Sequence, residues 1–89
     1  MLMIRHAIGS RLFLQTEDYS VIREEENWVI TAAAKKEELE NLIAFKEELN
    51  LFVVGENEKT WYYSSDASIK IVGSDKVQVT ADHKTVYPV

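Results

Sequence analysis

Hydrophobic side chains recur at every second position in the first third of the chain. One set of alternate positions holds Leu2, Ile4, His6 and Ile8, and this pattern stops at Gly9-Ser10. The same alternation returns at residues 12–15. A period of two is that of a β-strand, whose successive side chains point to opposite faces. Residues 19–24 and 28–31 are rich in β-branched and aromatic residues and flank a polar tip, which predicts a hairpin.

The period changes between residues 33 and 49. At 100° per residue the apolar positions fall within a stripe about 160° wide. These positions are Leu39, Leu42, Ile43, Phe45 and Leu49, and the glutamates fall on the opposite side. The segment is therefore predicted to be one amphipathic helix over about 33–49. Asn50 is expected to close it in the left-handed conformation.

The chain after the helix returns to strand patterns. Residues 51–54 form a continuous apolar run, which is typical of a strand covered on both faces. Residues 60–64, 69–71 and 77–81 follow, with a turn at Gly73, and residues 86–87 precede Pro88, which ends pairing. The predicted order is four strands, one helix and four strands.

This order predicts a single α+β domain over 1–89, with a mostly antiparallel sheet of about six to eight strands. At about 4.8 Å per strand, a flat sheet of seven or eight strands would be more than about 30 Å wide. One helix of about 24 Å cannot cover such a sheet. We therefore expect a strongly curved sheet that closes towards a half-barrel, with the helix packed on it. The alternative is an open face that meets a second subunit, as in a homodimer.

Composition narrows the classes of protein that fit this pattern. The 89 residues are 46% hydrophobic and 28% charged, as in an ordinary globular domain. Cysteine is absent, which excludes disulfides, thiolate metal sites and a cysteine nucleophile. The first residues lack the apolar stretch of a secretory signal, and no run approaches the roughly 20 apolar residues of a membrane span. We expect a cytoplasmic protein without membrane contact.

Charge is concentrated in one segment. The net charge is −5, yet residues 24–58 hold ten glutamates and three lysines, a net charge of −7. An acidic chain lacks the cations that neutralise phosphates, so the sequence argues against direct nucleic-acid binding.

Histidine and carboxylate side chains offer one arrangement for a metal ion. His6 and His83 would meet if the terminal strands paired, and Asp66 or Asp82 would add a carboxylate. No two of these residues have the i, i+2 or i, i+4 spacing of metal ligands. We therefore interpret His6 as a half-buried strand residue and His83 as an exposed turn residue, and predict no metal site.

Nucleophilic and phosphate chemistry lack their usual motifs. Ser64, Ser65 and Ser68 lie near Asp66, but no serine is flanked by glycines as in a nucleophile elbow. Serines beside an aspartate between strands are typical turn formers. The three glycines stand alone, so no phosphate-binding loop is present. We predict no catalytic residue, no cofactor and no enzyme activity.

Two features have a functional interpretation. The first is an acidic helix face for which only Lys36–Glu40 offers an i, i+4 ion pair, and that in the weaker orientation. It suits a protein partner with a basic surface, including mimicry of a nucleic-acid backbone, although an ordinary solvated face has the same appearance. Its residues are Glu37, Glu40, Glu47 and Glu48.

The second feature is the aromatic run at residues 61–63. In a strand, Trp61 and Tyr63 share one face and Tyr62 takes the other. Large aromatic side chains left exposed are favoured at interfaces and in ligand pockets. The alternative is that helix and sheet cover both faces.

The leading hypothesis is a small non-catalytic inhibitor, adaptor or regulator. It would bind a partner through the four helix glutamates together with Trp61 and Tyr63. Small accessory proteins with which bacteria or their phages block enzymes share this size and acidity. One alternative is a small-ligand protein with a pocket between helix and curled sheet, lined by Trp28, Trp61, Tyr63 and His6. A second is a structural subunit that associates through its sheet edges.

Overall fold

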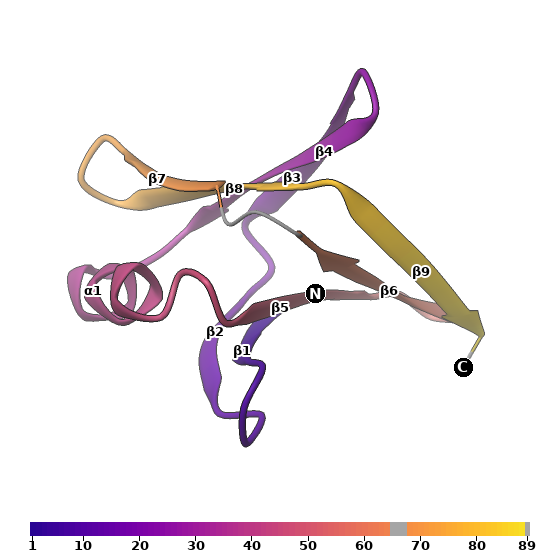
Figure 1. The fold of residues 1–89 in the computed structure, drawn as a ribbon, viewed down its shortest axis with the longest axis horizontal. Coiled ribbons are helices and arrows are strands. Elements are labelled where there is room, and N and C mark those ends of the chain that lie inside the picture. The colour runs from indigo at the N-terminus through magenta and orange to yellow at the C-terminus, as the bar shows by residue number, and fades with distance from the viewer. Residues whose placement is uncertain (65–67, 89) are drawn as a thin grey trace.

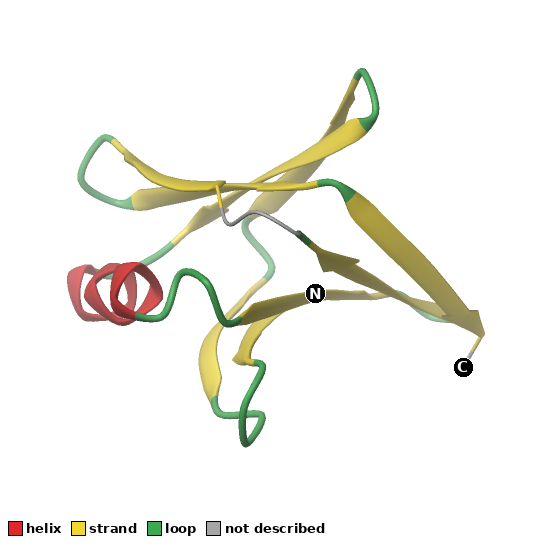
Figure 2. Ribbon diagram, in the orientation of Figure 1, coloured by secondary structure: helices red, strands yellow, loops and turns green. Residues whose placement is uncertain are grey.

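The computed structural model describes residues 1–64 and 68–88, and these form nine strands and one helix (Figures 1 and 2). The elements in chain order are β1 (Leu2–His6), β2 (Leu12–Thr16), β3 (Tyr19–Glu24), β4 (Asn27–Ala33), α1 (Lys36–Ala44), β5 (Leu49–Val54), β6 (Glu58–Tyr63), β7 (Ser68–Val72), β8 (Lys76–Ala81) and β9 (His83–Pro88). The α+β class and the antiparallel pairing predicted from the sequence are confirmed.

The strands form two separate sheets. Sheet A has the order β2-β1-β5-β6-β9, and sheet B has the order β3-β4-β8-β7. Neither sheet is strongly curled, so the prediction of one strongly curved sheet was wrong. The chain changes sheet four times: between β2 and β3, between β4 and β5 through α1, between β6 and β7, and at Asp82, which alone separates β8 from β9 (Figure 1). Because the two sheets cover each other's inner faces, neither has to curl to bury its apolar side.

The hydrophobic core lies between the two sheets. Sheet A contributes buried residues from alternate positions of four strands, Leu2, Ile4, Leu14, Leu51 and Tyr62. Sheet B contributes Ile30, Ala32, Val77, Val79 and Ala81. Each of these residues fits the period of two in its strand, which is why the sequence pattern located the strands well.

The helix is shorter than predicted. It has nine residues, Lys36–Ala44, because β-pairing takes both ends of the predicted range 33–49. Ala33 pairs with Lys76 in sheet B, and Leu49 pairs with His6 in sheet A. Asn50, expected at a left-handed helix end, instead lies within β5.

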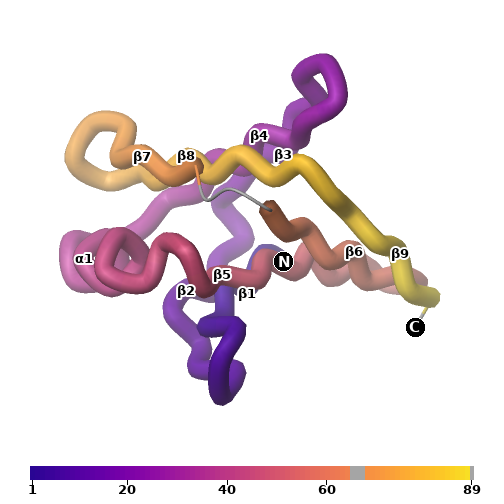
Figure 3. The backbone as a smooth tube through the Cα atoms, viewed as in Figure 1, coloured from indigo at the N-terminus to yellow at the C-terminus, as the bar shows by residue number. Residues whose placement is uncertain are grey.

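The helix covers the gap between the two sheets. It contacts β2 at the edge of sheet A and β7 at the edge of sheet B (Figures 1 and 3). Leu39 and Leu42 are its buried side chains and join the core, while Ile43 is 39% exposed. At its start the backbone N–H of Lys35 donates to the Glu38 carboxylate at 2.8 Å, which satisfies one of the free N–H groups there.

Candidate functional site

The outer face of sheet A carries a group of aromatic side chains. Leu51 and Tyr62 point to the core, so their strand neighbours Phe52 and Trp61 point outwards. The strand register adds further outward residues, because Tyr63 pairs with His83 and Lys59 pairs with Tyr87. We call this surface the aromatic face; it consists of Phe52, Lys59, Trp61, Tyr63, His83 and Tyr87.

This surface corrects one sequence interpretation. The continuous apolar run at residues 51–54 predicted a strand covered on both faces. β5 does lie in the middle of sheet A, between β1 and β6, and Leu51 is buried on the inner side. On the outer side, however, Phe52 is only half-buried, and neither sheet B nor α1, as the structure describes them, lies on this side. The run marks a central strand with an exposed aromatic side.

Four rings of the aromatic face form one continuous row across three strands. The Phe52 and Trp61 ring centroids are 6.4 Å apart at 20°, and those of Trp61 and Tyr63 are 4.3 Å apart at 31°. The row ends at His83, whose ring lies 5.0 Å from that of Tyr63 and nearly parallel to it at 9°. Ring pairs of this kind contribute about 0.5–1.5 kcal/mol each, so the rings hold one another in place.

A polar side chain fixes the centre of the row. The indole Nε1–H of Trp61 donates to Asn50 Oδ1 at 3.0 Å, from the neighbouring strand β5. The NH₂ group of the same Asn50 amide is a further hydrogen-bond donor on this face. Nearby, Lys59 Nζ lies 4.4 Å from the Phe52 ring centroid, in the geometry of a cation–π contact.

An open groove runs through this surface. It is lined by Asn50, Phe52, Lys59, Trp61 and Tyr87 and has a volume of about 410 Å³. Ligand sites in proteins have volumes of roughly 300–1,000 Å³, with mostly apolar walls and a few polar groups. The groove has aromatic walls, and its charged group is an ammonium.

The charge of the outer face of sheet A differs from that of the whole chain. The strand registers place Met3, Arg5, Gln15, Asn50, Thr85 and the aromatic face on this side. Among the strand residues that the structure describes, this side holds Arg5 and Lys59 and has no Asp or Glu. The described carboxylates lie in turns, on α1, on sheet B or, for Glu58, on the inner side of β6.

The four predicted partner-binding glutamates do not form one strip. Glu37 and Glu40 are exposed on α1, but Glu47 and Glu48 follow the end of the helix at Ala44. The Glu48 carboxylate lies 3.3 Å from His6 Nε2. The grouping assumed a helix as far as residue 49, and the earlier helix end separates its members.

The acidic helix and the predicted aromatic residues also lie apart. Trp61 and Tyr63 are on β6, and Figure 1 shows β6 and β9 on one side of the molecule with α1 on the other. The residues that join Trp61 and Tyr63 are Phe52, His83 and Tyr87, none of which the sequence analysis assigned to this surface. The strand register brings them together, and this register was not readable from the sequence.

The four residues predicted to line a pocket under the helix lie in three different places. His6 packs against the rings of Phe13 and Phe45 at centroid distances of 5.5 and 4.8 Å. The Trp28 ring lies 6.2 Å from that of Tyr62, on the core side of sheet A. Trp61 and Tyr63 belong to the aromatic face, so these four side chains do not line one cavity.

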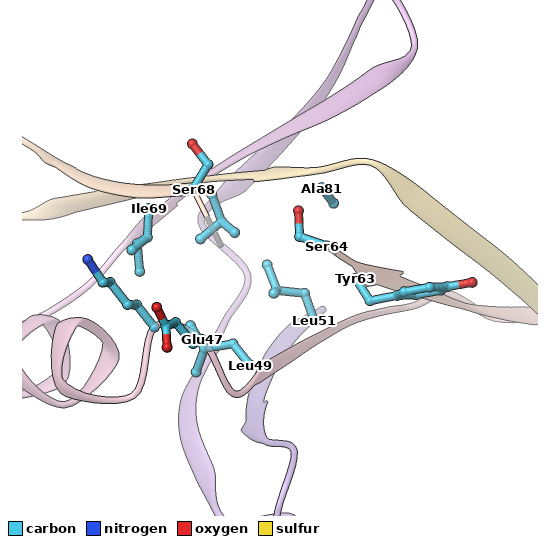
Figure 4. Close-up of a pocket in the computed structure, with 10 residues that line it drawn as sticks. Glu47, Leu49, Leu51, Tyr63, Ser64, Ser68, Ile69 and Ala81 are labelled. Atoms are coloured by element: carbon cyan, nitrogen blue, oxygen red, sulfur yellow. The ribbon is translucent and has the colours of Figure 1, made fainter. Parts of the chain in front are cut away.

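A small cavity does lie between the end of the helix and the two sheets (Figure 4). Its volume of about 30 Å³ is room for about one water molecule. Leu49, Leu51 and Ile69 are on its wall, while the ring of Tyr63 points away from it. The cavity is a packing gap and is too small for an organic ligand.

The candidate metal and serine residues are also separated. His6 lies in β1 near the end of α1, as the half-buried strand residue that was expected, whereas His83 stacks on Tyr63 in β9. Asp82 Oδ1 lies 2.5 Å from His83 Nδ1. Within residues 1–64 and 68–88, no three His, Asp or Glu side chains are placed to hold a metal ion. Ser65 and Asp66 lie outside the described residues.

One titratable group in the core has a shifted pKa. Burial raises the pKa of the Tyr62 hydroxyl, and the negative charges of ionised Tyr19 and of Glu58 raise it further. The hydroxyl is therefore neutral at physiological pH. It belongs to the inner side of sheet A and not to the aromatic face.

The chain matches no protein-family model, no curated protein and no solved structure. In the part of the chain that the structure describes, no helix has the length and apolar character needed to cross a membrane.

Proposed function

We propose that this protein is a non-catalytic interaction protein that binds a macromolecular partner on the aromatic face. The observation that supports the proposal is the row of four aromatic rings on an uncovered sheet face, with a groove beside it. The outer face of sheet B differs, because Thr31, Gln78 and Thr80 occupy its central strands.

The side chains of the aromatic face would lose little conformational entropy when a partner binds. Aromatic side chains are enriched among the residues that contribute most to binding energy. Here the rings are already held by stacking, and Trp61 is fixed by its hydrogen bond to Asn50. A partner would therefore lose little free energy in ordering them.

The acidic helix face is a separate surface in this proposal. Glu37 and Glu40 lie on α1, on the opposite side of the molecule from β9 (Figure 1). A partner with a basic region would contact them only if it also extended around the protein. The aromatic face is the primary site, and the glutamates are an auxiliary contact.

A small-ligand protein is the second candidate function. The groove volume of about 410 Å³ favours it, since this volume lies in the range of ligand sites. The groove is lined by residues of the aromatic face and Asn50, so this function would use the same surface.

Photo-crosslinking in the native host tests the proposal. A benzophenone amino acid replaces Tyr87, which is 42% exposed on the aromatic face, or Ile22, which is 60% exposed on the outer face of sheet B. We expect a covalent adduct of one defined mass from position 87 and none from position 22. The Trp61→Ala change in the position-87 protein should remove the adduct.

Two results would contradict the proposal. One is the absence of a macromolecular adduct at both positions, and the other is equal crosslinking from both faces. A small added mass retained at the groove in native mass spectrometry, without a macromolecule, would replace the proposal with the small-ligand function.

A further inference from the structure

We infer that the occupant of the aromatic face is single-stranded nucleic acid, with bases stacked on its rings and phosphates near Lys59 and Arg5. This inference rests on the proposed function and names the partner class of the same site. It reverses the expectation from net charge, because that expectation treated the charge as evenly spread.

The rings match the chemistry of bases. Sheets that bind single-stranded RNA stack two or three bases on aromatic side chains, and such stacking tolerates any sequence. His83 and Tyr87 have exposed rings at the two ends of β9, four residues apart, which is about 13 Å along a strand. Trp61 and Phe52 extend this surface across β6 and β5.

The polar groups match a polyanion. The groove presents the Lys59 ammonium, and Arg5 lies on the same outer face, one strand beyond Asn50. None of the strand residues described on this face is an Asp or Glu, and the bordering Asp82 carboxylate is held against His83 Nδ1. A ligand with both an aromatic group and an anion therefore fits the site. A single strand of nucleic acid offers a base and a phosphate at each nucleotide.

A single strand fits better than a single nucleotide because the surface continues beyond the groove. The groove ends at Tyr87 and Asn50, whereas Tyr63, His83 and Arg5 lie outside it. A duplex fits poorly, because its base faces are already stacked and unavailable to the rings.

The acidic helix region is largely screened from the aromatic face at physiological ionic strength. Of the ten glutamates in residues 24–58, those on α1 and after the helix lie on the opposite side of the molecule from β9 (Figure 1). Glu58 pairs with Pro88 at the end of β9, and the β3–β4 tip lies beside Trp28, whose ring is contacted by Lys84 of β9. The molecule measures 33 × 28 × 24 Å. The Debye length is about 8 Å at 0.15 M salt, so charges on the far side are largely screened there. At about 0.01 M salt the Debye length is about 30 Å, and the whole acidic molecule would then repel the strand.

Fluorescence anisotropy with 5′-labelled dT15 and rU15 at 0.1–0.15 M salt tests the inference on the full chain. We expect a Kd of about 1–100 µM, in the range of sequence-independent binding. A labelled dTMP should bind at least tenfold more weakly than dT15, because it contacts only one position of the surface. Between 0.1 and 0.3 M salt, two phosphate contacts predict a slope of log K against log salt of about −1.4.

Matched variants locate the binding. Tyr87→Ala should weaken dT15 binding at least fivefold, since losing one base stack costs about 1–3 kcal/mol. Lys59→Gln should reduce the salt slope by about 0.7. Ile22→Ala and Lys70→Gln make the same kinds of change on the outer face of sheet B and should leave binding within twofold of wild type. All four positions are at the surface, and circular dichroism confirms that each variant folds.

The outcomes separate the inference from the function on which it rests. Failure of dT15 and rU15 to bind at 100 µM protein, or equal effects of the variants on the two sheets, would overturn the inference. Binding of a poly-glutamate peptide in place of the oligonucleotides, lost in Tyr87→Ala, would overturn it while leaving the aromatic face as a docking site. Equal binding of dTMP and dT15 would make the occupant a small molecule.

Discussion

Replacing Leu42 by alanine tests the role of α1 as the element that covers the gap between the two sheets. The Leu42 side chain is fully buried, with 0% exposure, and belongs to the core between the sheets. The next residue, Ile43, is also aliphatic and of similar size, but it is 39% exposed on the same helix. Leu42 and Ile43 are therefore adjacent on the same helix but differ in burial.

The expected losses follow from this difference. A buried Leu→Ala change costs about 2–5 kcal/mol through lost burial and the cavity left behind. The stability of an 89-residue domain is roughly 5–13 kcal/mol, so Leu42→Ala should remove a large part of it. At about 4–8 °C per kcal/mol, the melting temperature should fall by at least about 8 °C. Ile43→Ala should cost less than about 1 kcal/mol, because the side chain is partly in water and alanine favours the helix.

Urea unfolding followed by tryptophan fluorescence and by circular dichroism measures both losses. Coincident transitions with unchanged slopes would allow the two free energies of unfolding to be compared directly. A loss below about 1 kcal/mol for Leu42→Ala, or equal losses for the two variants, would refute the claim that the helix closes the core.

Three further changes test local features. Glu38→Ala should cost about 0.5–1 kcal/mol in urea unfolding, because Glu38 accepts the hydrogen bond of the residue before α1, whereas Glu37→Ala in the same turn should cost less. Tyr62→Phe should reduce the loss of stability at high pH. The pKa of the Tyr62 hydroxyl is raised in the folded state, so this group stabilises the fold below its unfolded-state pKa near 10, and the contribution is lost as the pH rises through the folded-state pKa. Urea unfolding of both proteins from pH 8 to 11 would measure the difference. Asn50→Ala should shift the indole N–H resonance of Trp61 upfield and cost about 0.5–1.5 kcal/mol, because it removes that proton's acceptor.

The strands could be located from the sequence because burial on one side leaves a period of two. Ile30 and Ala32 on β4, and Val77 and Val79 on β8, alternate with half-buried residues as the pattern requires. The helix centre was equally clear from Leu39 and Leu42. These are local signals, and each depends only on neighbouring residues.

The helix ends and the division into two sheets depend on distant contacts. Ala33 and Leu49 fit a helical stripe, but Ala33 pairs with Lys76, and Leu49 pairs with His6. Pairing partners of this kind lie more than 40 residues apart, so local propensity does not reveal them. The chain changes sheet at the single residue Asp82, which a sequence pattern shows only as a turn.

The candidate site was found in part for the same reason. The alternation in residues 61–63 correctly placed Trp61 and Tyr63 on one face, with Tyr62 buried on the other. Phe52 and His83 join them only through the registers of β5 and β9 with β6. The prediction of an acidic strip, in contrast, required a helix that extends to residue 49. Because the helix ends at Ala44, Glu47 and Glu48 do not share its face with Glu37 and Glu40.

The two tryptophans provide the most direct test of the aromatic face. Trp61 lies on the outer face of sheet A, whereas Trp28 packs against Tyr62 on the core side. A ¹H–¹⁵N spectrum of the protein contains one indole resonance from each, and both can be followed while dT15 is added. We expect the Trp61 resonance to shift in a saturable way and the Trp28 resonance to stay in place. A spectrum in which neither moves, or in which only the Trp28 resonance moves, would contradict this expectation.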